Sequence, residues 1–273
     1  MATQVTKKAV SDFWNAHPLG SYEIPFPKDS KEYFQELAKI RSSSSGFVRE
    51  FYEFENTKGK KVLDVGCGPG WISFNYAANK AFIFSIDIAL NAVKMAKGFF
   101  DEQGLNSHFH VADAENLPFK EGSFDFVISE GVLHHTPNAA NGLSEIYRVL
   151  KKGGKAAVSF YEKNWLLSRP VFPITLLLMR LLGVKLHGAE NIGRVTPQEL
   201  ARMYDGIDNP LGDIKTRSEW EKMLKECGFV VTQRKRYYFP ARFFRLGKHF
   251  PSWLHCFLDR TCGTMVFFKV EKK

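Results

Sequence analysis

The sequence predicts an α/β protein with a doubly wound, mostly parallel sheet, and two observations lead to this prediction. Five short apolar runs follow one another along the chain, each typical of a parallel strand buried on both faces. They are VLDV (62–65), AFIFSID (81–87), SHFHVAD (107–113), FDFVIS (124–129) and KAAVSFY (155–161). Helical patterns lie between them, among them residues 71–78, 91–100 and 139–150. Such alternation implies right-handed crossovers, which place helices on both faces of one sheet.

The residues before this region predict a helical cap. Apolar residues recur every three or four positions over residues 33–40, and Asp29 or Ser30 can begin a helix there. The serine run 42–45 is expected to end that helix. The last of these serines can begin a second helix over residues 47–54.

The strand–helix rhythm stops after Tyr161. The following fifty residues hold a broken apolar stretch (171–184), a predicted helix (197–204) and a turn-rich acidic loop (204–213). The chain then predicts a helix over 217–227 that ends at Gly228, and two strands at 229–239 and 264–270.

Composition is that of a globular protein: 273 residues, 44% hydrophobic and 25% charged. The formal net charge of +9 comes wholly from residues 161–273, which carry 20 basic and 11 acidic residues. This basic C-terminal region indicates either contact with an anionic substrate or membrane surface, or a solubilising face.

Cysteine usage and the absence of a targeting pattern predict a cytoplasmic protein. Four cysteines lack the paired spacing of a zinc site and are expected to be free thiols, without bound metal. The N-terminal residues contain no apolar signal region. The apolar stretch 171–184 is shorter than the roughly 20 residues of a bilayer-spanning helix.

The strongest motif is VLDVGCGPG, residues 62–70, in which a buried strand delivers Asp64 and then a glycine turn. Glycines in such a turn let a ligand touch bare backbone, and the helix that follows presents unpaired N–H groups. A dinucleotide fingerprint would need a glycine at position 71, where this chain has Trp71; its third glycine is Gly70. A smaller, zwitterionic group is therefore favoured over a pyrophosphate.

Acidic residues follow the next two predicted strands. Asp87, 21 residues after Gly66, can accept hydrogen bonds from both hydroxyls of a ribose. Asp113 can accept from an adenine amino group, while the N–H of Ala114 donates to a ring nitrogen. Either acid alone can instead cap a helix, but three such features at one sheet edge favour an adenosine-containing ligand.

In these motifs, residues 57–160 resemble the class I S-adenosylmethionine-dependent methyltransferases, especially the group that includes ubiquinone and menaquinone methyltransferases and many small-molecule methyltransferases. SEGVLHHTPN (129–138) and LKKGGKAAVSFY (150–161) complete the likeness. The resemblance implies a Rossmann-like sheet of seven strands in the order 3-2-1-4-5-7-6 with the last strand antiparallel. It also implies S-adenosyl-L-methionine as cofactor and S-adenosyl-L-homocysteine as product.

We therefore divide the chain into four parts. These are a helical N-terminal cap (1–56), the cofactor-binding α/β core (57–161), a helical lid insertion for the substrate (162–215) and a C-terminal helix with the last two strands of the same sheet (216–273).

The same resemblance implies which residues hold the cofactor. Backbone of the glycine turn and Asp64 would hold the methionine part, and the Ser129 carbonyl would lie near the methionine amine. The full expected set is Asp64, Gly66, Cys67, Gly68, Gly70, Asp87, Ile88, Asp113, Ala114 and Ser129. A fainter likeness over residues 13–22 suggests that Trp14, His17 or Tyr22 closes over the cofactor; ordinary packing is the alternative.

Methyl transfer from a sulfonium mainly requires alignment and exclusion of water. A base is needed as well if the acceptor is a hydroxyl, an acidic carbon or a protonated amine. The candidates are Glu130, His134 and His135. Since adjacent residues of a helix point about 100° apart, at most one histidine is expected to face the substrate, with the other supporting it.

The remaining segments point to different acceptors. The apolar lid residues predict a hydrophobic pocket or the packing face of a helix, and the acidic loop 204–213 favours a cationic or polyhydroxylated acceptor. The basic C-terminal region favours a phosphorylated substrate or a membrane surface.

We expect transfer to an O, N or C centre of a small molecule, with a peripheral-membrane quinone or lipid methyltransferase as the alternative. RNA methylation is less favoured, and no stable nucleic-acid partner is expected, because the position after the fourth strand reads SEGV without proline and no RNA-binding module is present. A non-catalytic cofactor-binding protein is disfavoured by the complete set of cofactor residues. The sequence does not indicate the oligomeric state.

Overall fold

The computed structural model describes residues 5–19, 24–28, 30–44, 48–182, 184, 195–239 and 250–273. In this part of the chain, seven strands form one sheet in the order β3-β2-β1-β4-β5-β7-β6. Their bounds are β1 Lys61–Val65, β2 Phe82–Asp87, β3 His108–Val111, β4 Phe124–Glu130, β5 Leu150–Tyr161, β6 Phe229–Tyr237 and β7 Met265–Lys272. Only β7 runs antiparallel to its neighbours, so the predicted strand order and orientation are confirmed.

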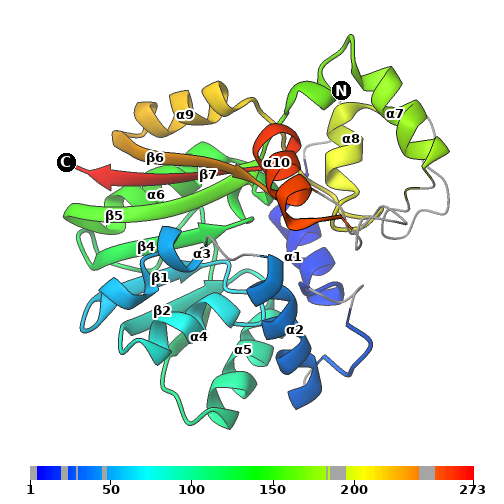
Figure 1. Cartoon of the computed structure of the whole chain (residues 1–273). Coiled ribbons are helices and arrows are strands. Elements are labelled where there is room, and N and C mark those ends of the chain that lie inside the picture. The colour runs from blue at the N-terminus through cyan, green and yellow to red at the C-terminus, as the bar shows by residue number, and fades with distance from the viewer. Residues whose placement is uncertain are drawn as a thin grey trace.

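Helices cover both faces of the sheet (Figure 1). On one face lie α2 (Lys31–Ser44), α3 (Val48–Phe51), α4 (Trp71–Ala78) and α5 (Leu90–Glu102), and on the other α6 (Ala139–Val149) and α9 (Arg217–Glu226). The doubly wound α/β architecture follows from this arrangement.

Each face of the sheet has its own apolar core. On the α6–α9 face, Trp220 stacks on Phe160 at 4.2 Å between ring centroids, and its Nε1–H donates to the Tyr161 carbonyl oxygen at 2.8 Å. On the other face, Phe34 of the N-terminal segment stacks on Phe99 at 4.6 Å. The predicted cap is therefore part of the core, because its aromatic residues bury apolar area against α5.

Four helices gather at the edge of the sheet where the parallel strands end, on the right of Figure 1. They are α1 (Lys7–Ala16), α7 (Phe172–Leu181), α8 (Pro197–Arg202) and α10 (Ser252–Cys262). The segment that holds α7 and α8 buries a small apolar core of its own, which includes Leu167, Leu176, Leu200 and Ile214. A Thr196–Glu199 capping box begins α8.

Several element bounds differ from the predictions. Helix α2 continues through Ser44, because serine is tolerated in a helix. Residues 45–47, where a second helix was predicted to begin, lie outside the described residues, and α3 begins at Val48. Helix α10 was not predicted at all, since its large apolar residues Trp253 and Phe257 face solvent instead of the core.

Within the described ranges, every helix is too short or too polar to cross a membrane.

Candidate active site

A cavity of about 390 Å³ lies at the carboxyl edge of the sheet, within the size range of small-molecule sites. Of the thirteen residues that the sequence suggested, ten line it: Gly66, Cys67, Gly68, Asp87, Ile88, Asp113, Ala114, Glu130, His134 and His135. Asp64, Gly70 and Ser129 do not line the cavity. Asp64 and Ser129 are buried in the sheet behind it.

The glycine turn after β1 combines tight packing with bare backbone. Gly66 has φ +79°, and a Cβ there would lie 2.2 Å from the Val132 Cγ2 atom, so no larger residue fits. Gly68 also has positive φ, at +51°, but a Cβ there would meet no atom within 4 Å. Because Gly68 lines the cavity, that empty space is part of it. The turn thus presents backbone to a ligand, which suits the amino-acid part of S-adenosylmethionine.

Asp87 is held rigidly at the end of β2. Its Oδ2 accepts from the Gly68 N–H at 3.0 Å and its Oδ1 from the Ala89 N–H at 2.8 Å. Burial raises the pKa of this carboxyl group, and the backbone donors oppose that rise. Each carboxylate oxygen has a second lone pair, so the group can also accept from two neighbouring hydroxyls of a ribose.

Asp113, beyond the end of β3, already has two partners. Its Oδ1 accepts from the Glu115 N–H at 2.9 Å, and its Oδ2 lies 2.5 Å from the Lys7 Nζ atom. Lys7, at the start of α1, also contacts Glu115 at 2.9 Å, and these bonds raise the pKa of Lys7. Asp113 does not cap a helix, and an adenine would have to share its carboxylate with these partners.

Of the three residues suggested to close over the cofactor, Trp14 of α1 lines the cavity and contacts His135, with 5.2 Å between ring centroids. The His17 ring packs on Phe13 instead, at 4.9 Å. Tyr22 lies outside the described residues.

Glu130, one of the candidate bases, is held in a buried ion pair. Its Oε1 lies 2.5 Å from Arg41 Nη2, and its Oε2 accepts from the Tyr52 hydroxyl at 2.6 Å. The Arg41 guanidinium also lies 4.9 Å from the centroid of the Trp71 ring. Because both carboxylate oxygens of Glu130 already have a partner, this arrangement disfavours Glu130 as a base. Arg41 lines the cavity, and sequence reasoning missed it because α2 offers only a helical pattern.

Both histidines after β4 line the cavity. That at most one of them would face the substrate stays a prediction. The segment Leu133–His135 is a single 3₁₀ turn, and the centroids of its two histidine rings lie 4.2 Å apart. Burial and the adjacent His135 lower the pKa of His134 well below its ordinary value, so this ring is neutral. His134 packs on Tyr161 at 4.0 Å, and its ring nitrogens make no regular hydrogen bond to described residues.

His135, in contrast, has an oxygen atom close to each of its two ring nitrogens. Its Nδ1 contacts the Leu211 carbonyl oxygen, and its Nε2 lies 3.2 Å from Asp205 Oδ2. Of the three acids in the loop 204–213, Asp205 lines the cavity; Asp213 pairs with Lys215, and Asp208 is exposed.

Some of the positive charge of the basic C-terminal region is paired with acidic side chains within the fold. Arg234 lies 2.5 Å from Glu221, and the Arg236 Nε donates to the buried Glu162 at 2.8 Å. Three further basic residues of this region, Arg242, Arg245 and Lys248, lie outside the described residues.

The buried carboxyl group of Asp64 allows the effect of burial on the stability of the protein to be tested. It accepts from the Ser73 hydroxyl at 2.6 Å, yet burial raises the pKa of its carboxyl group to about 7. The unfolded chain loses this proton near pH 4, whereas the folded protein keeps it until about pH 7. Asp64 therefore reduces stability as the pH rises through that window, by up to about 1.4 kcal/mol per pH unit.

We expect Asp64→Asn to gain free energy of unfolding relative to wild type between pH 4 and pH 7, and to gain no more above pH 7. Urea unfolding at each pH measures this difference, with Asp101→Asn on the surface of α5 as control. If the free energy of unfolding of the variant differed from that of wild type by the same amount at every pH from 4 to 7, the prediction would be wrong.

Comparisons with known proteins agree with this geometry. Residues 63–158 match the family described as a methyltransferase domain. The chain is 31% identical to a ubiquinone biosynthesis O-methyltransferase of Idiomarina loihiensis over 206 residues, which cover 74% of this chain and 80% of that one. It is 29% identical to norajmaline N-methyltransferase of Rauvolfia serpentina over 57% of this chain and 59% of that one.

The fold is also that of magnesium protoporphyrin IX methyltransferase from Synechocystis, a structure with bound S-adenosylhomocysteine. The TM-score is 0.61 at 18% identity, with 98% of this chain and 100% of that chain covered. The similarity to the ubiquinone O-methyltransferase, the match to the methyltransferase domain and the cavity at the expected sheet edge lead to one conclusion. The chain belongs to the class I S-adenosylmethionine-dependent methyltransferases and is an enzyme that uses S-adenosyl-L-methionine as its methyl donor.

Proposed function

We propose that this enzyme methylates a small molecule bound beside His134, His135 and Tyr204, while the cofactor occupies the glycine-turn end of the same cavity. The observation that carries this proposal is that one cavity joins the two ends. The cofactor supplies an electrophilic methyl group on a good leaving group, so the protein's part is to align the acceptor and exclude water.

For the cofactor, backbone of Gly66, Cys67 and Gly68 would hold the methionine part, Asp87 the ribose, and Asp113 with Ala114 the adenine. The Arg41–Glu130 pair supports the same orientation, because a zwitterionic amino acid offers a carboxylate to Arg41 and an ammonium to Glu130. Asp64 and Ser129 do not line the cavity, so they would support these contacts from the sheet behind it without touching the cofactor.

A matched pair of glycine substitutions tests this placement. Gly68 and Gly59 both have positive φ and empty space around a Cβ, but Gly59 precedes β1 and does not line the cavity. Each change to alanine therefore adds similar backbone strain of about 1–2 kcal/mol. We expect Gly68→Ala to weaken S-adenosylhomocysteine binding at least tenfold in calorimetry, and Gly59→Ala to leave it unchanged. Equal affinities for the two variants would refute the placement.

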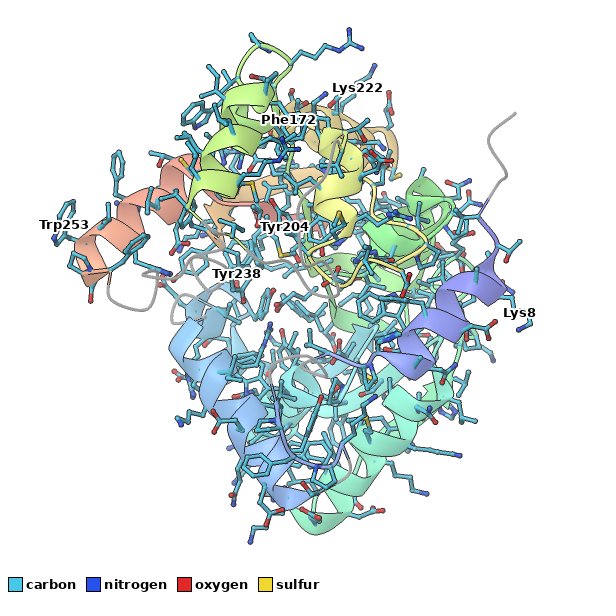
Figure 2. The ribbon with its side chains drawn as sticks, turned by 90° about the vertical axis from the view of Figure 1, so that its right-hand side faces the viewer. Lys8, Phe172, Tyr204, Lys222, Tyr238 and Trp253 are labelled. Carbon is cyan, nitrogen blue, oxygen red and sulfur yellow. The ribbon has the colours of Figure 1, made fainter. Side chains whose placement is uncertain are left out.

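For the acceptor, part of the cavity lining is aromatic, with Trp14, Tyr161 and Tyr204 beside the two histidines. Figure 2 shows Tyr204 and Tyr238 in the interior, between the lid helices and the core. Such a wall suits a flat or apolar acceptor with a polar reacting group. The O-methylating ubiquinone relative supports this class of acceptor.

The direct test uses S-adenosylmethionine with a labelled methyl group, incubated with the enzyme and either a small-metabolite extract or total RNA. We expect label in the organic-soluble small molecules. Label in RNA alone would favour nucleic-acid methylation instead, and no transfer to either would oppose the proposed activity.

The four parts of the chain described above also remain our proposal for its organisation. The free cysteines support a reducing, cytoplasmic location.

We also propose where the enzyme encounters its acceptor. The exposed face of α7 and α10 would dock on a membrane that contains anionic lipid. On α7, Phe172, Leu176 and Met179 face inward, while the opposite side is also apolar and exposed. Its exposed residues are Ile174, Leu177, Leu178 and Leu181, followed by Leu182. A helix that is apolar all round needs a second apolar neighbour on its outer side.

Helix α10 extends this surface. Trp253 and Phe257 are 71% and 58% exposed, and Figure 2 shows Trp253 at the outer edge of the molecule. The Nε1–H of Trp165, just before α7, donates to the Thr261 carbonyl oxygen at 3.1 Å, which joins the two surfaces. On the inner side of α10, His255 and Asp259 line the cavity, so a lipid-soluble acceptor would have a short path inward.

Charge favours anionic lipid as the occupant. Residues 163–182 contain three basic residues, Lys163, Arg169 and Arg180, and no acidic one. Basic residues beside exposed apolar ones are typical of helices that lie in the interface of an anionic membrane.

We expect the protein to float with vesicles of phosphatidylcholine and phosphatidylserine, less so in high salt. The double variant Leu178→Glu/Leu181→Glu should lose most of this flotation. The control is Phe82→Glu, which replaces an equally exposed apolar residue at the start of β2. Unchanged flotation of the α7 variant, or none by wild type, would contradict the docking surface.

A further inference from the structure

We propose that Tyr238 recognises the positive charge of the methyl donor. Its ring, which a strained backbone presents to the cavity, binds the sulfonium of S-adenosylmethionine in preference to the neutral thioether of S-adenosylhomocysteine. This inference rests on the proposed function, because it concerns the cofactor end of the same cavity. The residues placed at the cofactor above all lie between Arg41 and Glu130 in sequence, whereas Tyr238 comes from the C-terminal part of the chain.

The backbone at Tyr238 is strained. Its φ of +61° lies in the left-handed region, which is unfavourable for a residue with a Cβ and rare for a bulky aromatic one. In the described part of the chain, Glu53 and Lys80 are the other non-glycine residues with positive φ, and neither lines the cavity. Strain of this kind persists where the surrounding structure imposes it, and it is typical of ligand-binding sites.

Two neighbours hold this strained conformation. Tyr238 directly follows β6, and its carbonyl oxygen accepts from the Thr264 N–H at 3.1 Å and from the Thr264 hydroxyl at 2.8 Å. The N–H of the same peptide group, that of Phe239, donates to the buried Asp259 at 2.7 Å. Because both polar groups of this peptide are bound, it cannot rotate to relieve the strain without losing hydrogen bonds.

The side chain of Tyr238 lies at the end of the cavity that holds the Arg41–Glu130 pair. It lines the cavity, and Figure 2 shows it in the interior of the molecule. Burial lowers the pKa of Arg41, but the adjacent Glu130 and Tyr238 raise it, and the net result is a rise. Tyr238 is therefore close enough to Arg41 to interact with it electrostatically, at the end where we place the methionine part of the cofactor.

The covalent structure of the cofactor brings its sulfur to this ring. A short methylene chain joins the sulfur to the carbon that carries the ammonium and carboxylate groups, and a methylene group joins it to the ribose. With the amino-acid group at Arg41 and Glu130 and the ribose at Asp87, the sulfur has to lie between them. A ring beside Arg41 is then within reach of the sulfur.

Charge distinguishes the two forms of the cofactor. The donor carries a positive charge on its sulfur, whereas the product is a neutral thioether. The face of an aromatic ring attracts a cation, and the attraction is stronger where water is excluded. Arg41 does not offset it, because its own charge is paired with that of Glu130. The Tyr238 ring therefore stabilises the bound donor more than the bound product, which favours replacement of the product by a new donor molecule.

The test is calorimetry on the full-length protein with three ligands. They are S-adenosylmethionine, S-adenosylhomocysteine and sinefungin, a stable analogue in which a carbon bearing an ammonium group replaces the sulfonium. We expect Tyr238→Leu, which keeps the strain but removes the ring, to weaken binding of the two cationic ligands about three- to thirtyfold. Its affinity for S-adenosylhomocysteine should change by less than about twofold, because leucine retains most of the dispersion contact with a thioether.

Two variants serve as controls. Tyr238→Phe keeps the ring and should retain the preference for the cationic ligands. Tyr147→Leu makes the same change at a half-buried tyrosine of α6 that does not line the cavity, and it should leave all three affinities unchanged.

The contribution of the strained backbone is tested at Thr264. Thr264→Val removes the hydroxyl that binds the Tyr238 carbonyl oxygen but keeps the shape of the side chain, so the ring is held less firmly. We expect the preference for the cationic ligands to fall in this variant and to be retained in Thr264→Ser, which keeps the hydroxyl. This pair of variants decides the question even if Tyr238→Leu does not fold.

The inference is overturned if Tyr238→Leu lowers the affinities for all three ligands by the same factor or leaves them all unchanged, or if the two Thr264 variants behave alike. Failure of wild type to bind any of the three ligands would instead refute the proposed function itself.

Discussion

Parallel strand pairing is the constraint on which the whole site depends. Because β1 pairs in parallel with both β2 and β4, the three strands end at one edge and bring their following residues together. The glycine turn, Asp87 and the histidine turn come from three distant parts of the sequence and meet there. A one-residue slip in either pairing would turn these side chains toward the opposite face of the sheet.

The parts of the site that sequence could predict are those that depend on local structure and strand order. The turn at Gly66 to Gly68 is visible because only glycine allows its backbone, and Asp87 is visible because it directly ends an apolar run. These features carry the family resemblance, and the resemblance implied the order of all seven strands that the structure has. Neither the glycine turn nor Asp87 depends on contacts between side chains that are distant in sequence, so both can be recognised in the sequence itself.

Residues that reach the cavity from elsewhere could not be predicted in the same way. Arg41 belongs to a cap helix whose pattern shows only an apolar stripe, and its partner Glu130 lies 89 positions away. Asp205 is one of three acids in a loop, and nothing in the loop distinguishes it from Asp208. Only tertiary packing decides which acid reaches the cavity, and the same holds for the two histidines of the 3₁₀ turn, which both line it.

Helix α1 forms part of the cavity wall and is held by polar contacts near both of its ends as well as by buried apolar residues. Lys7 reaches Asp113 at one end of the helix, and Trp14 reaches His135 near the other. The Lys7 side chain is 45% exposed, and an ion pair of that kind contributes at most about 1 kcal/mol. Because Lys7, Val10 and Trp14 of this helix line the cavity, its position sets how much of a bound cofactor is shielded from water.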